Sequence, residues 1–96
     1  MGIKYTADYK TIIEDLAEGI YQIENFYDFF EMNIEDWQEC SEKEKKNYAS
    51  TLADDLFYAL GTENNINLGK GIVKYNSIKS IIEVFNNDDC IKTIKL

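Results

Sequence analysis

The sequence predicts an α+β fold in which N-terminal helices pack on a C-terminal antiparallel sheet. Apolar residues recur at helical spacing up to Gly61, whereas β-branched residues dominate after Gly71. A chain of 96 residues can bury one modest core, but not two. We therefore expect a single domain, 1–96, with a helical half at 1–61, a connecting loop at 62–70 and a β-meander at 71–96.

The first helix is expected at about 7–32. Thr6 can cap it, which places Asp8 in the first turn, where the helix dipole favours an anion. Gly19 weakens this helix and can let another backbone approach closely. The aromatic stretch at 26–30 either continues the helix or restarts it after a kink. The apolar stripe consists of Tyr9, Ile12, Ile13, Leu16, Ala17, Ile20 and Ile23.

A short helical turn is expected at 34–39 and a second long helix at 42–60. Asn33 followed by Asp36 is typical of a helix start, and this turn carries Trp37. Ser41 and Glu44 form a capping box, in which each side chain accepts a hydrogen bond from the other's backbone N–H. Gly61 is the expected left-handed terminator of the long helix. Its apolar stripe consists of Tyr48, Ala49, Leu52, Ala53, Leu56, Ala59 and Leu60.

Three strands are expected at 71–76, 78–85 and 90–96. Asn76-Ser77 and the segment 86–89 supply the turns, because Asn and Asp tolerate left-handed backbone. The middle strand should place Ile78, Ser80, Ile82 and Val84 on one face, and Lys79, Ile81, Glu83 and Phe85 on the other. Neither face is cleanly polar, so we expect the second face to be covered by the aromatic helical segment or by another subunit.

The composition argues against catalysis. The chain contains no His, which removes the usual general base, triad partner and metal ligand. Cys40 and Cys90 therefore have no imidazole partner, and we expect both to be free thiols. Carboxylates one helical turn apart, such as Glu14 and Glu18, could hold a hydrated cation loosely, but a solvated acidic face is the favoured interpretation. We expect a non-enzymatic protein with no cofactor and no metal site.

The sequence also favours a cytoplasmic location. Its longest apolar runs are only a few residues, and the first residues lack the apolar core of a secretion signal. Direct nucleic-acid binding is disfavoured, because the chain has no Arg and a net charge of −8.

Negative charge is concentrated in the helical half. Residues 1–69 hold fifteen acids and five Lys, a net of −10, whereas residues 70–96 hold three acids and five Lys, a net of +2. Aromatic residues lie among these acids, and Tyr and Trp commonly anchor interfaces while carboxylates at the rim steer a basic partner. The alternative is that the aromatics form the core and the acids only confer solubility. The candidate partner-binding residues are Glu31, Glu35, Asp36, Trp37, Glu39, Asp54 and Asp55.

In its size, its charge, its lack of Arg and His and its lack of catalytic motifs, the chain resembles small acidic phage-encoded anti-defence proteins. These include anti-CRISPR proteins and other DNA mimics. The resemblance implies an inhibitor that occupies the basic nucleic-acid-binding surface of a host effector, with carboxylates in place of phosphates. The chain is also similar to acidic immunity proteins that neutralise basic nuclease toxins.

Two other classes stay open. The chain could be a homo-oligomeric structural or regulatory protein, with the second sheet face or the 78–85 strand as the contact. It could also be a metal-dependent enzyme or a cation-binding module. The expected partner is a basic protein surface, and the chain itself is expected to be a monomer or a homodimer.

Overall fold

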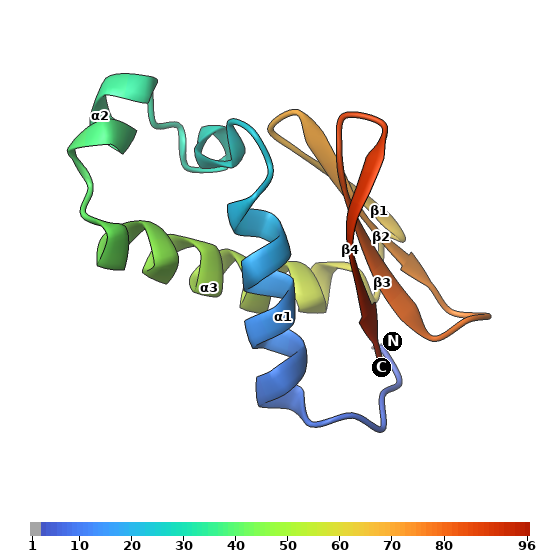
Figure 1. Ribbon diagram of the computed structural model, residues 1–96. Coiled ribbons are helices and arrows are strands. Elements are labelled where there is room, and N and C mark those ends of the chain that lie inside the picture. The colour runs from blue at the N-terminus through green and yellow to red at the C-terminus, as the bar shows by residue number, and fades with distance from the viewer. Residues whose placement is uncertain (1–2) are drawn as a thin grey trace.

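The computed structural model describes residues 3–96 as a sheet with helices on one side (Figure 1). The elements follow in the order α1 (Tyr9–Tyr21), η1 (Phe26–Phe30, a 3₁₀-helix), α2 (Ile34–Glu39), α3 (Glu42–Ala59), β1 (Asn65–Leu68), β2 (Gly71–Asn76), β3 (Ile81–Asn86) and β4 (Asp89–Lys95). This order confirms the α+β prediction, with helices first and an antiparallel sheet last.

The helix expected at 7–32 divides into two elements. α1 ends at Tyr21, and η1 begins five residues later. Asn25 and Glu31, on either side of η1, both have left-handed backbone, with φ of 61° and 59°. Ile23, in the turn after α1, and Phe26, at the start of η1, are both buried in the core. The interpretation of a restart after a break is therefore the correct one.

The N-terminus of α1 lies later than expected. Asp8, not Thr6, caps the helix, and its carboxylate accepts the backbone N–H of Thr11 at 3.2 Å. Thr6 is used elsewhere, because its hydroxyl and its N–H both donate to the carbonyl of Leu96 at the end of the chain.

The long helix α3 begins as predicted. The Ser41 hydroxyl accepts the N–H of Glu44 at 3.1 Å, and the Glu44 carboxylate accepts the N–H of Ser41 at 3.0 Å. The backbone hydrogen bond also lowers the pKa of Glu44. Gly61 is not a left-handed terminator, since Gly69 is the one glycine with positive φ among the described residues. The helix ends instead through N–H bonds of Leu60 and Gly61 to carbonyls of the last turn.

The sheet has four strands in the order β1-β2-β3-β4, all antiparallel, so the expectation of three strands was wrong by one. The additional strand, β1, lies in the segment that was expected to be a loop. Ile66 pairs with Val73 and Leu68 pairs with Gly71, so the apolar residues of this Asn-rich segment alternate with its amides. Two apolar side chains are too few for a sequence pattern to separate a strand from a loop.

The strand expected at 78–85 is β3, which starts later than expected, at Ile81. Ile78 and Ser80 lie in the turn before it, where Ile78 is 95% exposed and Ser80 has φ of 53°. Ile82 and Val84 do share a buried face, as predicted. A bulge opposite Val84 places Ile91 and Lys92 of β4 together against the helical side, where Ile91 packs on the core.

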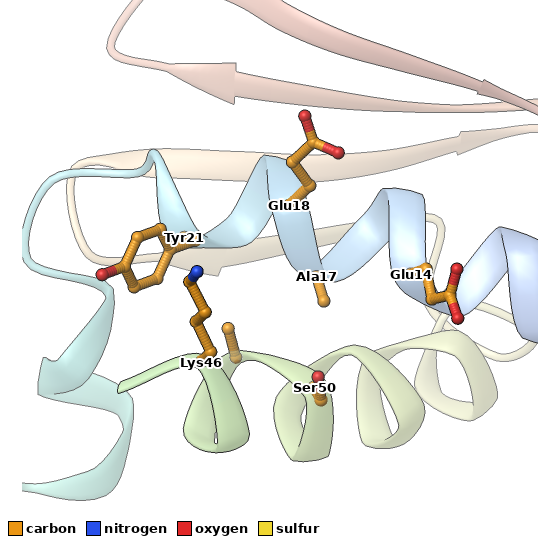
Figure 2. A pocket seen from close by; sticks show the side chains of 7 residues that line it. Glu14, Ala17, Glu18, Tyr21, Lys46 and Ser50 are labelled. Atoms are coloured by element: carbon orange, nitrogen blue, oxygen red, sulfur yellow. The ribbon is translucent and has the colours of Figure 1, made fainter. Parts of the chain in front are cut away.

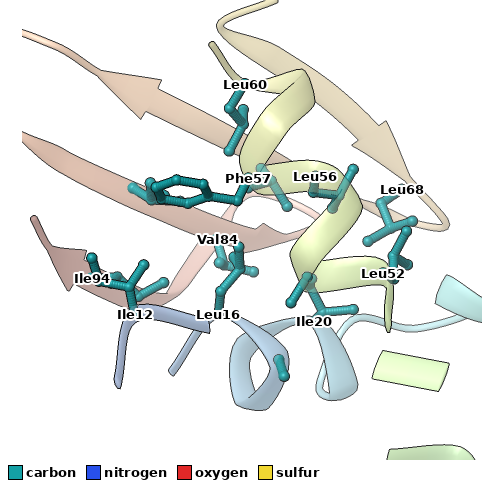
Figure 3. Close-up of a cluster of buried hydrophobic side chains, with 14 of the residues drawn as sticks. Ile12, Leu16, Ile20, Leu52, Leu56, Phe57, Leu60, Leu68, Val84 and Ile94 are labelled. Carbon is teal, nitrogen blue, oxygen red and sulfur yellow. The ribbon is translucent and has the colours of Figure 1, made fainter. Parts of the chain in front are cut away.

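The core lies between the inner sheet face and the pair α1 and α3 (Figure 3). Gly19 allows this packing to be close. A Cβ at Gly19 would lie 3.1 Å from both the Lys92 Cβ and the Val84 Cγ2, so the approach expected at this glycine is made by side chains of the sheet. The labelled core residues are Ile12, Leu16, Ile20, Leu52, Leu56, Phe57, Leu60, Leu68, Val84 and Ile94.

Candidate functional site

The candidate site is formed by η1 and α2, which extend from the body of the molecule near the start of α3 (Figure 1). Asn33 caps α2, and its amide oxygen accepts the N–H of Asp36 at 2.8 Å. The helix that follows is only six residues long and has no buried residue. A helix of this length gains little stability by itself, so its position depends on side-chain contacts.

Trp37 supplies those contacts. Its ring stacks on Tyr27 at 5.2 Å between centroids and meets the edge of Phe26 at 4.9 Å. Tyr48 and the ammonium of Lys45, both from α3, approach the same ring at 6.2 and 5.3 Å. The half-buried Trp37 therefore serves mainly to hold α2 against η1 and α3.

Exposed carboxylates are concentrated on the segment that carries Trp37. The fifteen residues 28–42 contain six acids and no Lys, and all six acids are exposed. Two large apolar side chains lie among them, Phe29 at 50% exposure and Ile34 at 49%. We call this surface the acidic end; it consists of Asp28, Phe29, Glu31, Ile34, Glu35, Asp36, Glu39 and Glu42.

The structure does not bring all the predicted site residues together. Glu31, Glu35, Asp36 and Glu39 share the acidic end. Asp54 and Asp55 are exposed on α3, twelve and thirteen residues after Glu42, which is about 18–20 Å along the axis at 1.5 Å per residue. They form a separate surface beside Tyr58, which is 75% exposed.

Asp54 has a structural partner. The hydroxyl of Tyr9 in α1 donates a hydrogen bond to its carboxylate. That hydrogen bond, together with partial burial and the negative charge of Asp54, raises the pKa of Tyr9 well above its ordinary value. Asp54 therefore links α1 to α3. This structural role accounts for the residue without a partner protein.

A shallow groove of about 240 Å³ runs between α1 and α3 (Figure 2). Ala17 and Ala49 are small enough to leave it open, and Lys46 and Tyr21 lie together at one end. Glu18 points away toward the sheet, where its carboxylate lies 3.6 Å from the ammonium of Lys92. The groove thus combines a small apolar floor with isolated polar groups at its rim, without a nucleophile and base in contact.

A second hollow, of about 350 Å³, adjoins the acidic end. The rings of Phe26, Tyr27 and Trp37 line it, together with Tyr21 and Lys45. Because Lys45 already lies over the Trp37 ring, a cationic side chain from a partner would have to displace it to reach that face.

Residues 3–96 can be inspected for metal ligands and for membrane-spanning helices. This part of the chain contains no group of three or more His, Cys, Asp or Glu side chains placed to hold a metal ion. Its helices are also too short or too polar to cross a bilayer. Both cysteines are free thiols, with Cys90 exposed and Cys40 half-buried.

Four residues of the acidic end were missed by the sequence prediction: Asp28, Phe29, Ile34 and Glu42. For Asp28 and Glu42 the available signal is acid density: six acids fall within 28–42, at the end of a stretch, 11–42, that contains no Lys. The exposure of Phe29 and Ile34 could not be anticipated, because large apolar side chains are more often buried.

Comparison with known proteins does not place the chain in a family. No family model, no curated protein and no solved structure matches it.

Proposed function

We propose that this protein is a non-enzymatic inhibitor that binds a basic surface of another protein through its acidic end. The observation that carries the proposal is that all six carboxylates of 28–42, a segment without Lys, are exposed together with the half-exposed Phe29 and Ile34. Such a surface offers both charge and apolar area to a partner.

The carboxylates and the apolar side chains of the acidic end have different roles in binding. Carboxylates at the rim accelerate encounter with a basic partner and fix its orientation, but exposed ion pairs add little affinity each. Burial of Phe29 and Ile34 would supply the apolar part, at roughly 25 cal/mol per Å² of apolar surface. Packing of Trp37 on Tyr27 keeps α2 in place before the partner arrives, which reduces the ordering cost of binding.

The partner chemistry that fits best is a groove that normally holds nucleic acid. Such grooves are lined by Lys and Arg that contact phosphates. Carboxylates presented along η1, α2 and the start of α3 would replace those phosphates, and the bound protein would exclude the nucleic acid. This is the mode of action of an anti-defence protein such as an anti-CRISPR, acting in the cytoplasm. A basic nuclease toxin would be a partner of the same chemistry.

The test is capture of partners from a cell extract on the immobilised protein at low ionic strength, followed by elution with duplex DNA or RNA. We expect to capture a basic nucleic-acid-binding protein, which both the competing nucleic acid and raised salt should release.

A Glu35→Lys/Glu39→Lys variant should lose at least about tenfold in affinity for the purified partner. Fluorescence of Trp37, the one Trp of the chain, reports binding at the acidic end directly.

The matched control is Glu14→Lys/Glu63→Lys, which makes the same charge change at exposed acids outside the acidic end. It should bind nearly as well as the unmodified protein. The proposal fails if the two variants lose equal affinity, or if nucleic acid does not compete with the captured protein.

A further inference from the structure

No helix or strand of residues 3–96 covers the sheet face that points away from α1 and α3 (Figure 1). Ile72 and Phe85 are direct cross-strand partners on this face, and Ile81 lies further along β3. All three are half-buried, yet none packs against the core, unlike Ile66, Tyr75 and Ile91 on the inner side. The expectation that the aromatic helical segment covers this second face is thus wrong, and its apolar residues have no partner within the described chain.

Charge distinguishes this outer face from the rest of the molecule. Lys74 and Lys95 lie on it with a single acid, Glu83, which gives +1 on a chain whose net charge is −8. Lys74 is directly opposite Glu83 across the strands, but its ammonium lies 5.1 Å from the Phe85 ring, and Glu83 forms no ion pair with a described residue. The outer face of one chain therefore presents one acid, Glu83, and two lysines, Lys74 and Lys95.

We propose that the occupant of the outer face is a second copy of this chain, stacked sheet against sheet about a two-fold axis. An isologous contact requires a self-complementary surface, and Glu83 of one copy can meet a lysine of the other. At the acidic end, six exposed carboxylates of each copy would face those of the other. The outer face, at +1, therefore opposes self-association less than the acidic end does.

The size of the face sets the expected strength of this dimer. Four strands spaced about 4.8 Å apart, with six residues of about 3.4 Å in β2 and β3, cover about 400 Å². Two such faces fall below the area typical of permanent dimers. We therefore expect a weak dimer, with a dissociation constant in the micromolar range or above.

Sedimentation equilibrium over a wide concentration range tests the proposal. We expect a reversible monomer–dimer equilibrium that Phe85→Lys weakens by about tenfold or more, since it removes the central ring and adds a charge. Ile78→Lys is the matched control, because Ile78 is 95% exposed in the β2–β3 turn and lies outside the face. Glu83→Lys supplies a second variant that leaves the apolar residues intact, and circular dichroism verifies that each variant is folded.

The response to salt distinguishes this dimer interface from the partner interface proposed for the acidic end. Raising the NaCl concentration should strengthen the dimer, because it screens the repulsion between two chains of net charge −8. The same change should weaken binding of a basic partner. A chain that stays monomeric at the highest concentrations, or a dimer weakened equally by Ile78→Lys and Phe85→Lys, would overturn the sheet-face dimer without affecting the function proposed for the acidic end.

Discussion

At the scale of single residues, Tyr9 and Asp54 show how one polar contact can join two helices. The Tyr9 ring packs edge-on against Phe57 at 5.2 Å while its hydroxyl donates to Asp54. The ring therefore contributes to packing and the hydroxyl to orientation. Spacing in the sequence indicated that Tyr9 belongs to the apolar stripe, but it could not show that an acid 45 positions later is its partner.

Replacing Tyr9 with Phe removes only the hydroxyl. We expect a loss of about 1 kcal/mol or less in the free energy of unfolding at neutral pH, since the hydrogen bond is exposed. The pKa of Tyr9 is raised in the folded protein, so its contribution is complete below the unfolded pKa of about 10 and is lost as the pH rises beyond it. Urea unfolding of both proteins, from neutral pH to about pH 11, should show the difference shrinking.

The control for this experiment is Tyr58→Phe, whose hydroxyl belongs to a side chain that is 75% exposed. It should change stability little at neutral pH. A difference between Tyr9→Phe and the unmodified protein that grows above pH 10 would contradict the assignment of Tyr9 as the donor.

At the scale of elements, the hairpins hold the turn that follows the N-terminal helix. The N–H of Lys70, at the β1–β2 turn, donates to the carbonyl of Glu24 at 2.9 Å. The amide oxygen of Asn86, at the end of β3, accepts the N–H of Glu24 at 3.0 Å. Both contacts satisfy backbone groups in the turn that follows α1, and so the sheet fixes the direction in which the chain continues toward the acidic end.

Gly69 is the residue that makes this contact possible. Its φ of +56° is left-handed, and a Cβ there would collide with the backbone of Glu24 and Asn25. We expect Gly69→Ala to lower the free energy of unfolding by about 2 kcal/mol or more, from backbone strain and from the collision. Chemical denaturation measures this loss.

Gly61→Ala is the matched control, because Gly61 follows α3 without a positive φ. Its effect should stay within about 1 kcal/mol. Equal losses in the two variants would mean that the turn of β1–β2 does not need to approach the segment after α1 this closely.

At the scale of the whole molecule, charge is arranged asymmetrically. The acids are concentrated on the helical side, and only two ion pairs join described residues, Lys70 with Glu24 and Lys92 with Glu18. Both pairs link the sheet to α1 or the turn after it. Most of the negative charge is therefore uncompensated, and it opposes the compact state through self-repulsion.

Screening this repulsion should stabilise the fold. We expect the melting temperature to rise with NaCl, by an amount corresponding to about 1 kcal/mol, or roughly 4–8 °C for a domain of this size. Differential scanning calorimetry at low and high salt measures the change. A Glu39→Gln/Asp55→Asn variant, with two fewer charges, should melt higher at low salt and respond less to salt. A melting temperature that falls with added NaCl would show that the two ion pairs outweigh the repulsion.

Local patterns were sufficient for the parts of the fold that depend on neighbours in the chain. The capping box of Ser41 and Glu44 and the apolar stripe of α3 act within one or a few helical turns, and both were predicted correctly. The break after Tyr21 was harder, because it depends on Asn86, which is 62 positions from its partner Glu24. The candidate site divided for the same reason: Glu35, Asp36 and Glu39 lie on α2, whereas Asp54 and Asp55 lie far along α3.

The sequence by itself determined the α+β class, the order of helices before strands, the strong start of α3 and the concentration of acids in the helical half. Each follows from composition or from interactions between residues a few positions apart. Only the tertiary structure decided that residues 65–68 form a strand, that one sheet face is left open, and that the acids of α2 are separated from Asp54 and Asp55. Those outcomes depend on strand pairing and on packing between distant segments, whose partners no local pattern specifies.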